Sequence, residues 1–155
     1  MVAAKMITIT IDGTNVQVPD GVYVWDACRM IGVEIPNFCY LPVLRAFGAC
    51  RMCVVEVSGR RGFELVTSCS TPATDGMEVR TINDNVWQQR NMVMEALDTD
   101  HPVDCPICEA NGDCRLPGYG DEYGVTASAP RRPQMVRPAG RPCPATGPKP
   151  APLRA

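Results

Sequence analysis

The sequence lacks the features that mark several protein classes. No apolar run approaches the roughly 18–20 residues that a helix needs to span a bilayer, so we expect no direct membrane insertion. The start of the chain has neither the apolar stretch nor the small-residue cleavage site of a secretory signal, which predicts a location on the cytosolic side. Only nine aromatic residues are present (two Trp, four Tyr and three Phe), so aromatic packing can supply little of the core.

Basic charge is scarce in most of the chain. Residues 1–124 contain nine Lys and Arg against 17 Asp and Glu, a net charge of −8, which argues against nucleic acid as a partner. Residues 125–155 contain six basic residues, no acid and no aromatic residue, together with eight of the fifteen prolines. Such a composition cannot bury enough apolar surface to offset chain entropy, so we expect a disordered tail over 125–155.

The first segment, residues 1–82, has the pattern of a small α+β sheet. Apolar and polar residues alternate over 6–18 around Asp12-Gly13, which predicts a β-hairpin. A short helix is expected at about 24–31, ended by Gly32. Three further strands are expected at Val54–Val57, Phe63–Val66 and Met77–Val79. We therefore expect one helix packed across a compact sheet.

The second segment, residues 83–124, has a helical pattern. Asn83 or Asp84 can cap a helix that runs to about Leu97, and His101-Pro102 ends it. Its apolar residues follow one stripe: Val86, Val93, Met94 and Leu97. A short cysteine-containing loop follows, up to Cys114.

Cysteine, with nine residues, is what the chain has in excess. Thiols stay reduced on the cytosolic side, so clustered cysteines are better interpreted as metal ligands than as disulfides. The first group has the spacing Cys39-x10-Cys50-x2-Cys53-x15-Cys69. Four thiolates around one irregular loop beside a sheet suit a [2Fe–2S] cluster. A zinc ribbon is the alternative, although such ribbons generally have two Cys-x2-Cys pairs and this group has one.

The second group begins at the only histidine: His101-x3-Cys105-x2-Cys108-x5-Cys114. One imidazole and three thiolates with such short gaps can surround a single compact cluster, and a zinc site with the same four ligands is the alternative. Two cysteines are left over. Cys28 lies on the expected short helix, where it is interpreted as a buried free thiol, and the tail residue Cys143 is interpreted as incidental.

Three runs of sequence carry a resemblance to a known family: IPNFCYLPVLRAFGACRMCVVEV, SCSTPATDGMEV and HPVDCPICEANGDC. Over about residues 5–125 the sequence resembles the large iron–sulfur subunits of NADH-quinone oxidoreductase, the respiratory complex I. It also resembles the related diaphorase subunits of soluble hydrogenases and NAD-dependent formate dehydrogenases. The resemblance implies a β-grasp [2Fe–2S] ferredoxin domain over 1–82 and a small helical [4Fe–4S] domain over 83–124.

The same resemblance implies the ligands of both clusters. Those of the [2Fe–2S] cluster would be Cys39, Cys50, Cys53 and Cys69. Those of the [4Fe–4S] cluster would be His101, Cys105, Cys108 and Cys114. The family motif usually continues Leu-Gln-Asp, whereas here it reads Leu116-Pro117-Gly118. Further clusters would normally follow, so we expect a truncated or frame-shifted product or a fragment.

The function that the resemblance implies is the relay of single electrons from a flavin subunit that oxidises NADH toward quinone. The protein would be a peripheral subunit on the cytoplasmic side of a membrane, or cytoplasmic, and would work with other subunits of a redox complex. No catalytic side chain is expected, because the clusters supply the chemistry. Three alternatives remain: a diaphorase subunit of a soluble hydrogenase or formate dehydrogenase, a standalone ferredoxin-like carrier, and a zinc-stabilised interaction module.

Overall fold

The computed structural model describes residues 5–60, 62–101 and 104–125. The chain begins with the expected hairpin, in which β1 (Met6–Ile11) pairs antiparallel with β2 (Thr14–Pro19). Asp12 and Gly13, at the turn, have φ angles of 47° and 83°. Both values are left-handed, as a two-residue turn that matches the strand twist requires. The tail expected over 125–155 lies outside the described residues after Val125.

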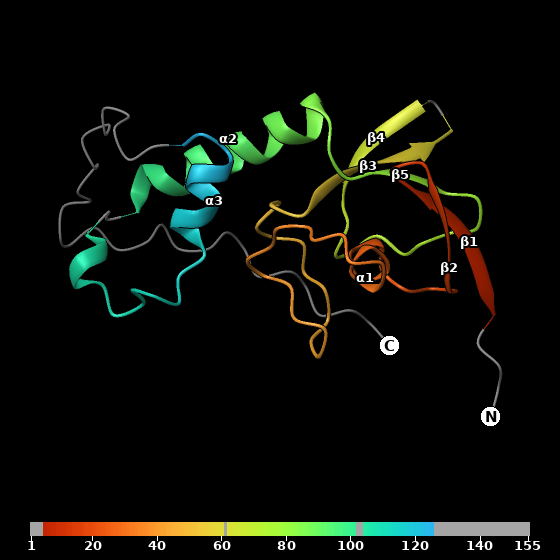
Figure 1. Ribbon diagram of the computed structural model, residues 1–155, viewed down its shortest axis with the longest axis horizontal. Helices are drawn as coiled ribbons and strands as arrows, with labels where there is room; N and C mark the ends of the chain where they lie inside the picture. The colour runs from red at the N-terminus through yellow and green to blue at the C-terminus, as the bar shows by residue number, and fades with distance from the viewer. Residues whose placement is uncertain (1–4, 61, 102–103, 126–155) are drawn as a thin grey trace, which may run out of the picture.

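The hairpin belongs to a five-stranded mixed sheet of order β2-β1-β5-β3-β4. The other strands are β3 (Val54–Gly59), β4 (Gly62–Thr67) and β5 (Glu78–Arg80), at the three expected places. β5 runs parallel to β1 and antiparallel to β3, which is antiparallel to β4. α1 (Val24–Met30) lies across one side of the sheet (Figure 1). The α+β fold class is therefore confirmed.

The main core lies between the sheet and α1. Alternate residues of β1 face it, since Ile7, Ile9 and Ile11 are buried while their neighbours are not. Val24, Ala27 and Cys28 of α1 form the other side. Period-2 burial on the strand and a narrow helical stripe are the patterns that a sheet and a covering helix produce.

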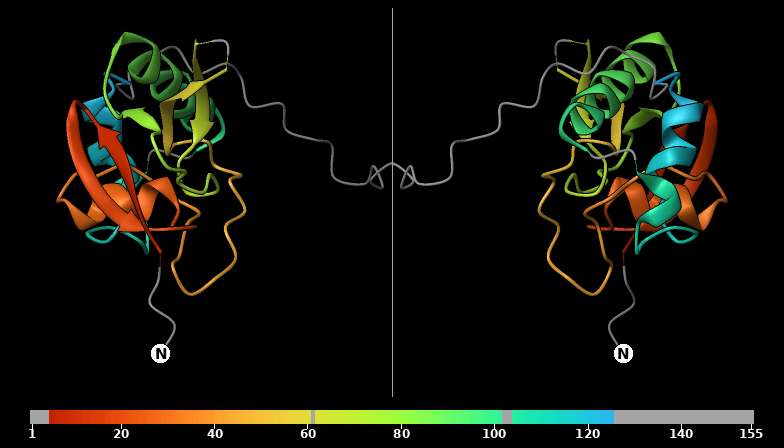
Figure 2. Two further views of the ribbon diagram at one scale, coloured as in Figure 1. Left: turned by 90° about the vertical axis from the view of Figure 1, so that its right-hand side faces the viewer. Right: turned by 90° about the vertical axis from the view of Figure 1, so that its left-hand side faces the viewer.

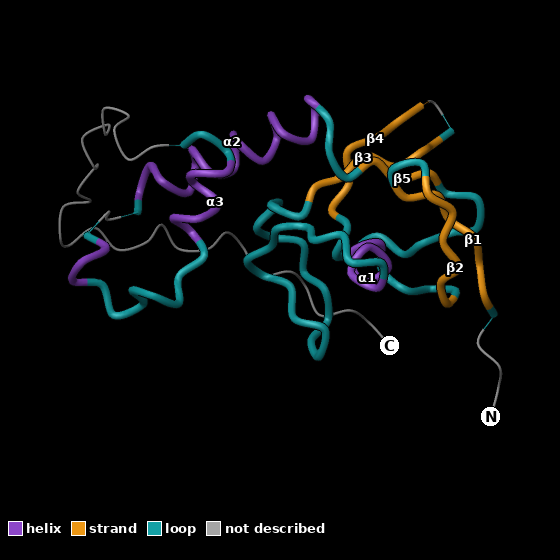
Figure 3. Tube along the Cα trace, in the orientation of Figure 1, coloured by secondary structure: helices purple, strands orange, loops and turns teal. Residues whose placement is uncertain are grey.

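A long loop without regular structure connects α1 to β3. It appears in teal in Figure 3, and Figure 2 shows it (orange) extending away from the strands. Its inner residues are buried near α1, where Trp25 Nε1 donates a hydrogen bond to the Ile35 carbonyl at 3.0 Å. Its outer part is exposed, including Val43 and Phe47. The loop is therefore anchored at one end and presents its middle to solvent.

The second segment has one long helix and two short ones. α2 (Asp84–Asp100) begins at the expected cap, because Asn83 Oδ1 accepts a hydrogen bond from Val86 N at 2.9 Å. It extends about one turn beyond the expected end at Leu97, and Leu97 is exposed rather than part of the buried stripe. A 3-10 turn, η1 (Cys105–Ile107), and the helix α3 (Leu116–Glu122) follow. Among the described residues, none of the helices is long and apolar enough to cross a bilayer.

A second, smaller core joins α2 and α3 to the loop that precedes β3. Its buried members are Met52, Met94 and Tyr123. Because Met52 lies between two cysteines of the first group and Met94 lies on α2, this core connects the two segments of the chain. The second segment is thus fixed beside the first cysteine group.

Candidate metal centres

The sheet brings the two ends of the first cysteine group together. Cys53 directly precedes β3, and Cys69 lies two residues after β4. These strands are antiparallel, with Val54 opposite Thr67, so both cysteines lie at the same end of the pair. Ser68 fixes the two segments to each other, because its N–H and hydroxyl donate to the Cys53 carbonyl at 3.1 and 2.7 Å. Cys53 and Cys69 are fully buried.

The other two cysteines of this group come from the long loop. The backbone N–H of Cys50 donates to Cys39 Sγ at 3.5 Å. Cys39 is exposed and Cys50 is half-buried. The site therefore has a buried side against the sheet and a solvent side formed by the loop.

The four thiols lie close enough to influence one another. Burial raises the pKa of the Cys69 thiol to about 12, and hydrogen bonding to Cys53 and the charges of the other three thiols act in the same direction. Burial also opposes ionisation of Cys50, but backbone hydrogen bonds, chiefly from Phe38 and Met52, outweigh it and lower its pKa. Four crowded thiols with approaching N–H donors are a donor set that fits an iron–sulfur cluster, whose cations relieve the mutual repulsion of the thiolates.

The loop approaches the Cys69 turn closely at Gly48. Its φ angle is 66°, in the left-handed region, and a Cβ there would lie 3.2 Å from Ser70 Oγ. Ser70 Oγ in turn lies 2.6 Å from Thr67 Oγ1, at the end of β4. A side chain at position 48 would push the loop away from this turn, so glycine keeps Cys50 near Cys69.

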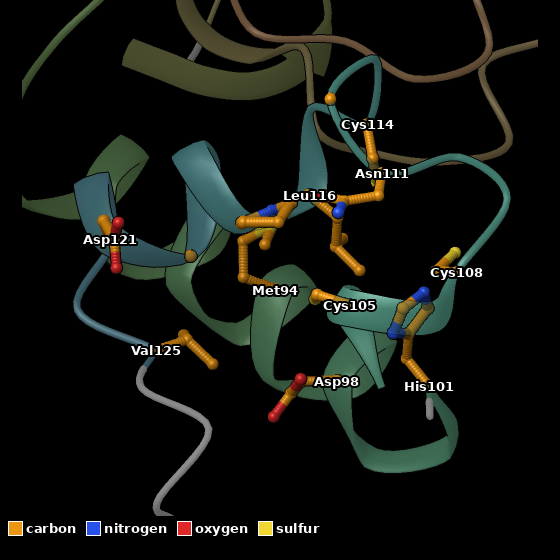
Figure 4. A pocket seen from close by; sticks show the side chains of 13 residues that line it. Met94, Asp98, His101, Cys105, Cys108, Asn111, Cys114, Leu116, Asp121 and Val125 are labelled. Atoms are coloured by element: carbon orange, nitrogen blue, oxygen red, sulfur yellow. The ribbon is translucent and has the colours of Figure 1, made fainter. Parts of the chain in front are cut away.

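The second group lies at the ends of three helices. His101 is the C-terminal cap of α2, Cys105 begins η1, Cys108 caps its end, and Cys114 precedes α3. All four line one cavity of about 230 Å³, together with residues of α2 and α3 (Figure 4). This volume far exceeds the roughly 10–15 Å³ that one water requires, so the cavity can hold a group of several atoms. One imidazole and three thiols fit a cluster of the kind that the spacing predicts.

The two groups border a common hollow. A second cavity, of about 540 Å³, is lined by Cys50 of the first group and by His101 and Cys114 of the second. Phe38 of the long loop and Leu97 of α2 also line it. Among the residues that the structure describes, no three His, Cys, Asp or Glu side chains meet the geometry of a site for a single metal ion.

Sequence reasoning found the two groups but missed what surrounds them. Arg90 is buried in the middle of α2, and Tyr123 is buried just after α3. The spacing of Arg90, four residues from both Val86 and Met94, places it on the buried stripe and could have indicated its burial. Cys28 is buried in the main core, as interpreted, and burial raises the pKa of its thiol to about 12. Cys143 lies outside the described residues.

Comparisons with known proteins agree on both halves of the chain. Residues 4–84 match the family model described as 2Fe-2S iron-sulfur cluster binding domain. Residues 90–129 match the model described as NADH-ubiquinone oxidoreductase-G iron-sulfur binding region. The two models together extend from the hairpin to a few residues past α3.

Two curated relatives resemble this protein over most of its length. NADP-reducing hydrogenase subunit HndD of Solidesulfovibrio fructosivorans is 41% identical over 129 residues, which cover 80% of this chain and 22% of the relative. A subunit of the NADH-quinone oxidoreductase of Mycobacterium bovis is 43% identical over 126 residues, covering 80% of this chain and 15% of the relative. The protein thus spans about a fifth or less of the length of these relatives.

A solved structure resembles the fold. A chain of the NAD+-reducing [NiFe]-hydrogenase in the H2-reduced state superposes with a TM-score of 0.70 and is 34% identical. The match covers 79% of this protein and 50% of the hydrogenase chain.

Proposed function

The chain belongs to the family of 2Fe-2S iron-sulfur cluster binding domains, extended by the iron-sulfur binding region of NADH-ubiquinone oxidoreductase-G, and on this premise we propose that it relays single electrons within a multi-subunit redox complex. Its cofactors are a [2Fe–2S] and a [4Fe–4S] cluster. When bound, these clusters supply one-electron redox chemistry. The side chains hold them, exclude water and set the electrostatic surroundings.

The proposed ligands are those predicted from the sequence. Cys39, Cys50, Cys53 and Cys69 hold the [2Fe–2S] cluster in a domain of residues 1–82. His101, Cys105, Cys108 and Cys114 hold the [4Fe–4S] cluster in a domain of residues 83–124. The observation that carries the proposal is the cavity that all four residues of the second group line. The mutual effect of the four thiols of the first group supports the other site.

The protein contributes differently on the two sides of the first site. Cys53 and Cys69 are fully buried, so the sheet side keeps water away from the ligands. The N–H of Cys50 donates toward the Cys39 sulfur, and such donors stabilise a negative sulfur and tune its cluster. Cys39 lies at the surface, where a partner can approach closely.

The proposed partner is a flavin subunit that oxidises NADH, with quinone as the eventual acceptor. Between Cys39 and Cys50 the loop exposes four large apolar side chains: Leu41, Val43, Leu44 and Phe47. Four large exposed apolar side chains within one ten-residue stretch are typical of a site that another protein covers. Contact here would bring the partner's redox group beside the first cluster.

A second candidate is a diaphorase-type subunit that passes electrons between a hydrogenase and a nicotinamide nucleotide. The likeness to the NADP-reducing hydrogenase subunit and to the NAD+-reducing [NiFe]-hydrogenase favours it. Both candidates assign the same task to this protein and differ in the partner that supplies the electrons.

Metal and sulfide analysis of anaerobically purified protein tests the proposal. We expect about six iron atoms and six labile sulfides per chain, two of each from one cluster and four from the other. Two paramagnetic signals should appear on stepwise chemical reduction. One equivalent or more of zinc with no visible absorption would contradict the proposal.

A further inference from the structure

Arg90 is a charged residue on a face of α2 that is otherwise apolar. Its neighbours at a spacing of four, Val86 and Met94, are 0% and 1% exposed, and Arg90 itself is only 5% exposed. Arginine is seldom buried to this degree unless it is paired with an acid, because removing its charge from water is costly.

The partners of Arg90 are all uncharged. Its Nη2 donates to the carbonyl of Val54 at 2.8 Å and to that of Thr81 at 3.2 Å. Its Nη1 donates to the hydroxyl of Tyr123 at 3.2 Å. Nε has no partner among the residues that the structure describes. Burial raises the pKa of Tyr123 despite the opposing effect of Arg90, so this hydroxyl stays neutral at ordinary pH.

The nearby carboxylates are engaged by other groups. Asp12 accepts from the N–H and the hydroxyl of Thr81, and Glu56 accepts from the side-chain amides of Asn83 and Asn85. The described part of the chain has two ion pairs, Lys5–Asp20 and Arg80–Glu78, and Arg90 takes part in neither. The donors to both carboxylates are uncharged, and neither carboxylate lies within ion-pair distance of the guanidinium.

The position of this charge relates it to both sites. The Val54 carbonyl that it binds belongs to the residue after Cys53. One turn along α2, Met94 lines the cavity of the second group and packs in the core that contains Met52. Arg90 therefore binds the residue next to one ligand candidate of the first site and lies one helical turn from the lining of the second.

We propose that Arg90 is a positioning residue that supplies a buried countercharge and makes the [2Fe–2S] cluster easier to reduce. The proposal rests on the proposed function. A cluster held by four thiolates becomes more negative by one charge on reduction, and a fixed cation in a poorly screened interior stabilises that state. A negative cluster near the guanidinium would also help to offset the cost of burying Arg90 outside an ion pair.

The test compares neutral and charged replacements in the full chain with its clusters bound. We expect Arg90→Met to lower the equilibrium constant for reduction of the [2Fe–2S] cluster by about tenfold. For a one-electron couple this is a shift of about 59 mV toward negative potential. Arg90→Lys keeps the charge and should retain most of the potential. The [4Fe–4S] potential should shift less in Arg90→Met. The readout is a redox titration followed by low-temperature paramagnetic resonance.

Arg29→Met, which removes an exposed charge from α1, is the matched control and should leave both potentials unchanged because solvent screens it. An unchanged [2Fe–2S] potential in Arg90→Met, or equal shifts in the Met and Lys variants, would overturn the proposal.

If Arg90→Met binds no cluster, the Lys variant decides. Cluster binding by Arg90→Lys supports a requirement for the charge, whereas loss of the cluster in both variants would overturn the proposal, because a cation at this position then does not suffice. Absence of clusters from the wild type would refute the proposed function itself, independently of Arg90.

Discussion

At the scale of single residues, burial alone does not identify a ligand. Cys28 and Cys53 are both fully buried. Cys28 lies among the apolar side chains between α1 and the sheet, whereas the thiol of Cys53 is close enough to that of Cys69 to help raise its pKa. A buried thiol with apolar neighbours acts as a small hydrophobe, and one that faces other thiols is suited to bind a metal.

This contrast gives a matched pair of variants. Cys53→Ala should abolish the [2Fe–2S] signal and leave the [4Fe–4S] signal, because it removes one of the four proposed ligands. Cys28→Ala should retain both signals and cost about 1 kcal/mol of stability through a small cavity. Iron content and paramagnetic resonance provide the measurement. If the Cys28 variant lost the [2Fe–2S] cluster and the Cys53 variant kept it, Cys28 would be the ligand and Cys53 the core thiol.

The histidine gives a second prediction. Neutral imidazole makes its cluster less negative than a fourth thiolate would, so His101→Cys should keep the [4Fe–4S] cluster but make it harder to reduce. His101→Ala should give a labile cluster or one that has lost an iron. The [2Fe–2S] signal should be unchanged in both variants. Identical [4Fe–4S] signals and potentials in the wild type and both variants would exclude His101 as a ligand.

At the scale of elements, the junction of the sheet with α2 depends on one asparagine. Asn83 Oδ1 caps the helix, and its Nδ2 donates to Glu56 of β3 at 2.7 Å. Glu56 is buried and also accepts from Asn85 Nδ2 at 2.9 Å. The first turn of α2 is therefore fixed to the central part of the sheet, and α2 in turn carries Arg90, Met94 and His101 to their places.

We expect Asn83→Ala to reduce the free energy of unfolding by about 2 kcal/mol, through loss of the cap and of one donor to a buried carboxylate. Asn85→Ala removes a donor to the same carboxylate without affecting the cap, so its cost should be below about 1 kcal/mol. Chemical denaturation of both variants provides the comparison. Equal costs would show that the cap contributes nothing.

At the scale of the whole molecule, charge is distributed unevenly along the chain. Residues 91–124, which include the proposed [4Fe–4S] ligands, contain eight acidic residues and one basic residue, Arg115. Residues 125–155 contain six basic residues and no acid. A region so negative favours contact with a basic surface and makes that contact sensitive to salt.

Deletion of residues 130–155 should leave both clusters bound. This part is rich in proline and lacks aromatic residues, so it can add little to a core, and both family matches end before it. Iron content, absorption and the two reduction potentials of the shortened chain provide the measurement. Loss of either cluster signal would show that the tail packs against the folded part.

The sequence by itself determined the local structure and the chemistry. Alternation around Asp12-Gly13 specifies the hairpin, and Asn83 specifies the start of α2, because strand period, turn conformation and capping are properties of neighbouring residues. The two groups of ligand candidates were likewise evident from residue type and spacing. Their role as cluster ligands stays a prediction.

Only the tertiary structure decided what lies around these groups. α3 was not predicted, since Pro117, Gly118 and Gly120 disfavour helix, yet Leu116 and Tyr119 pack against the second core and outweigh that preference. The stripe on α2 includes Arg90 and excludes Leu97. Burial and strand register depend on contacts between residues far apart in the chain, so local pattern could not show that Cys53 meets Cys69 at one end of two paired strands.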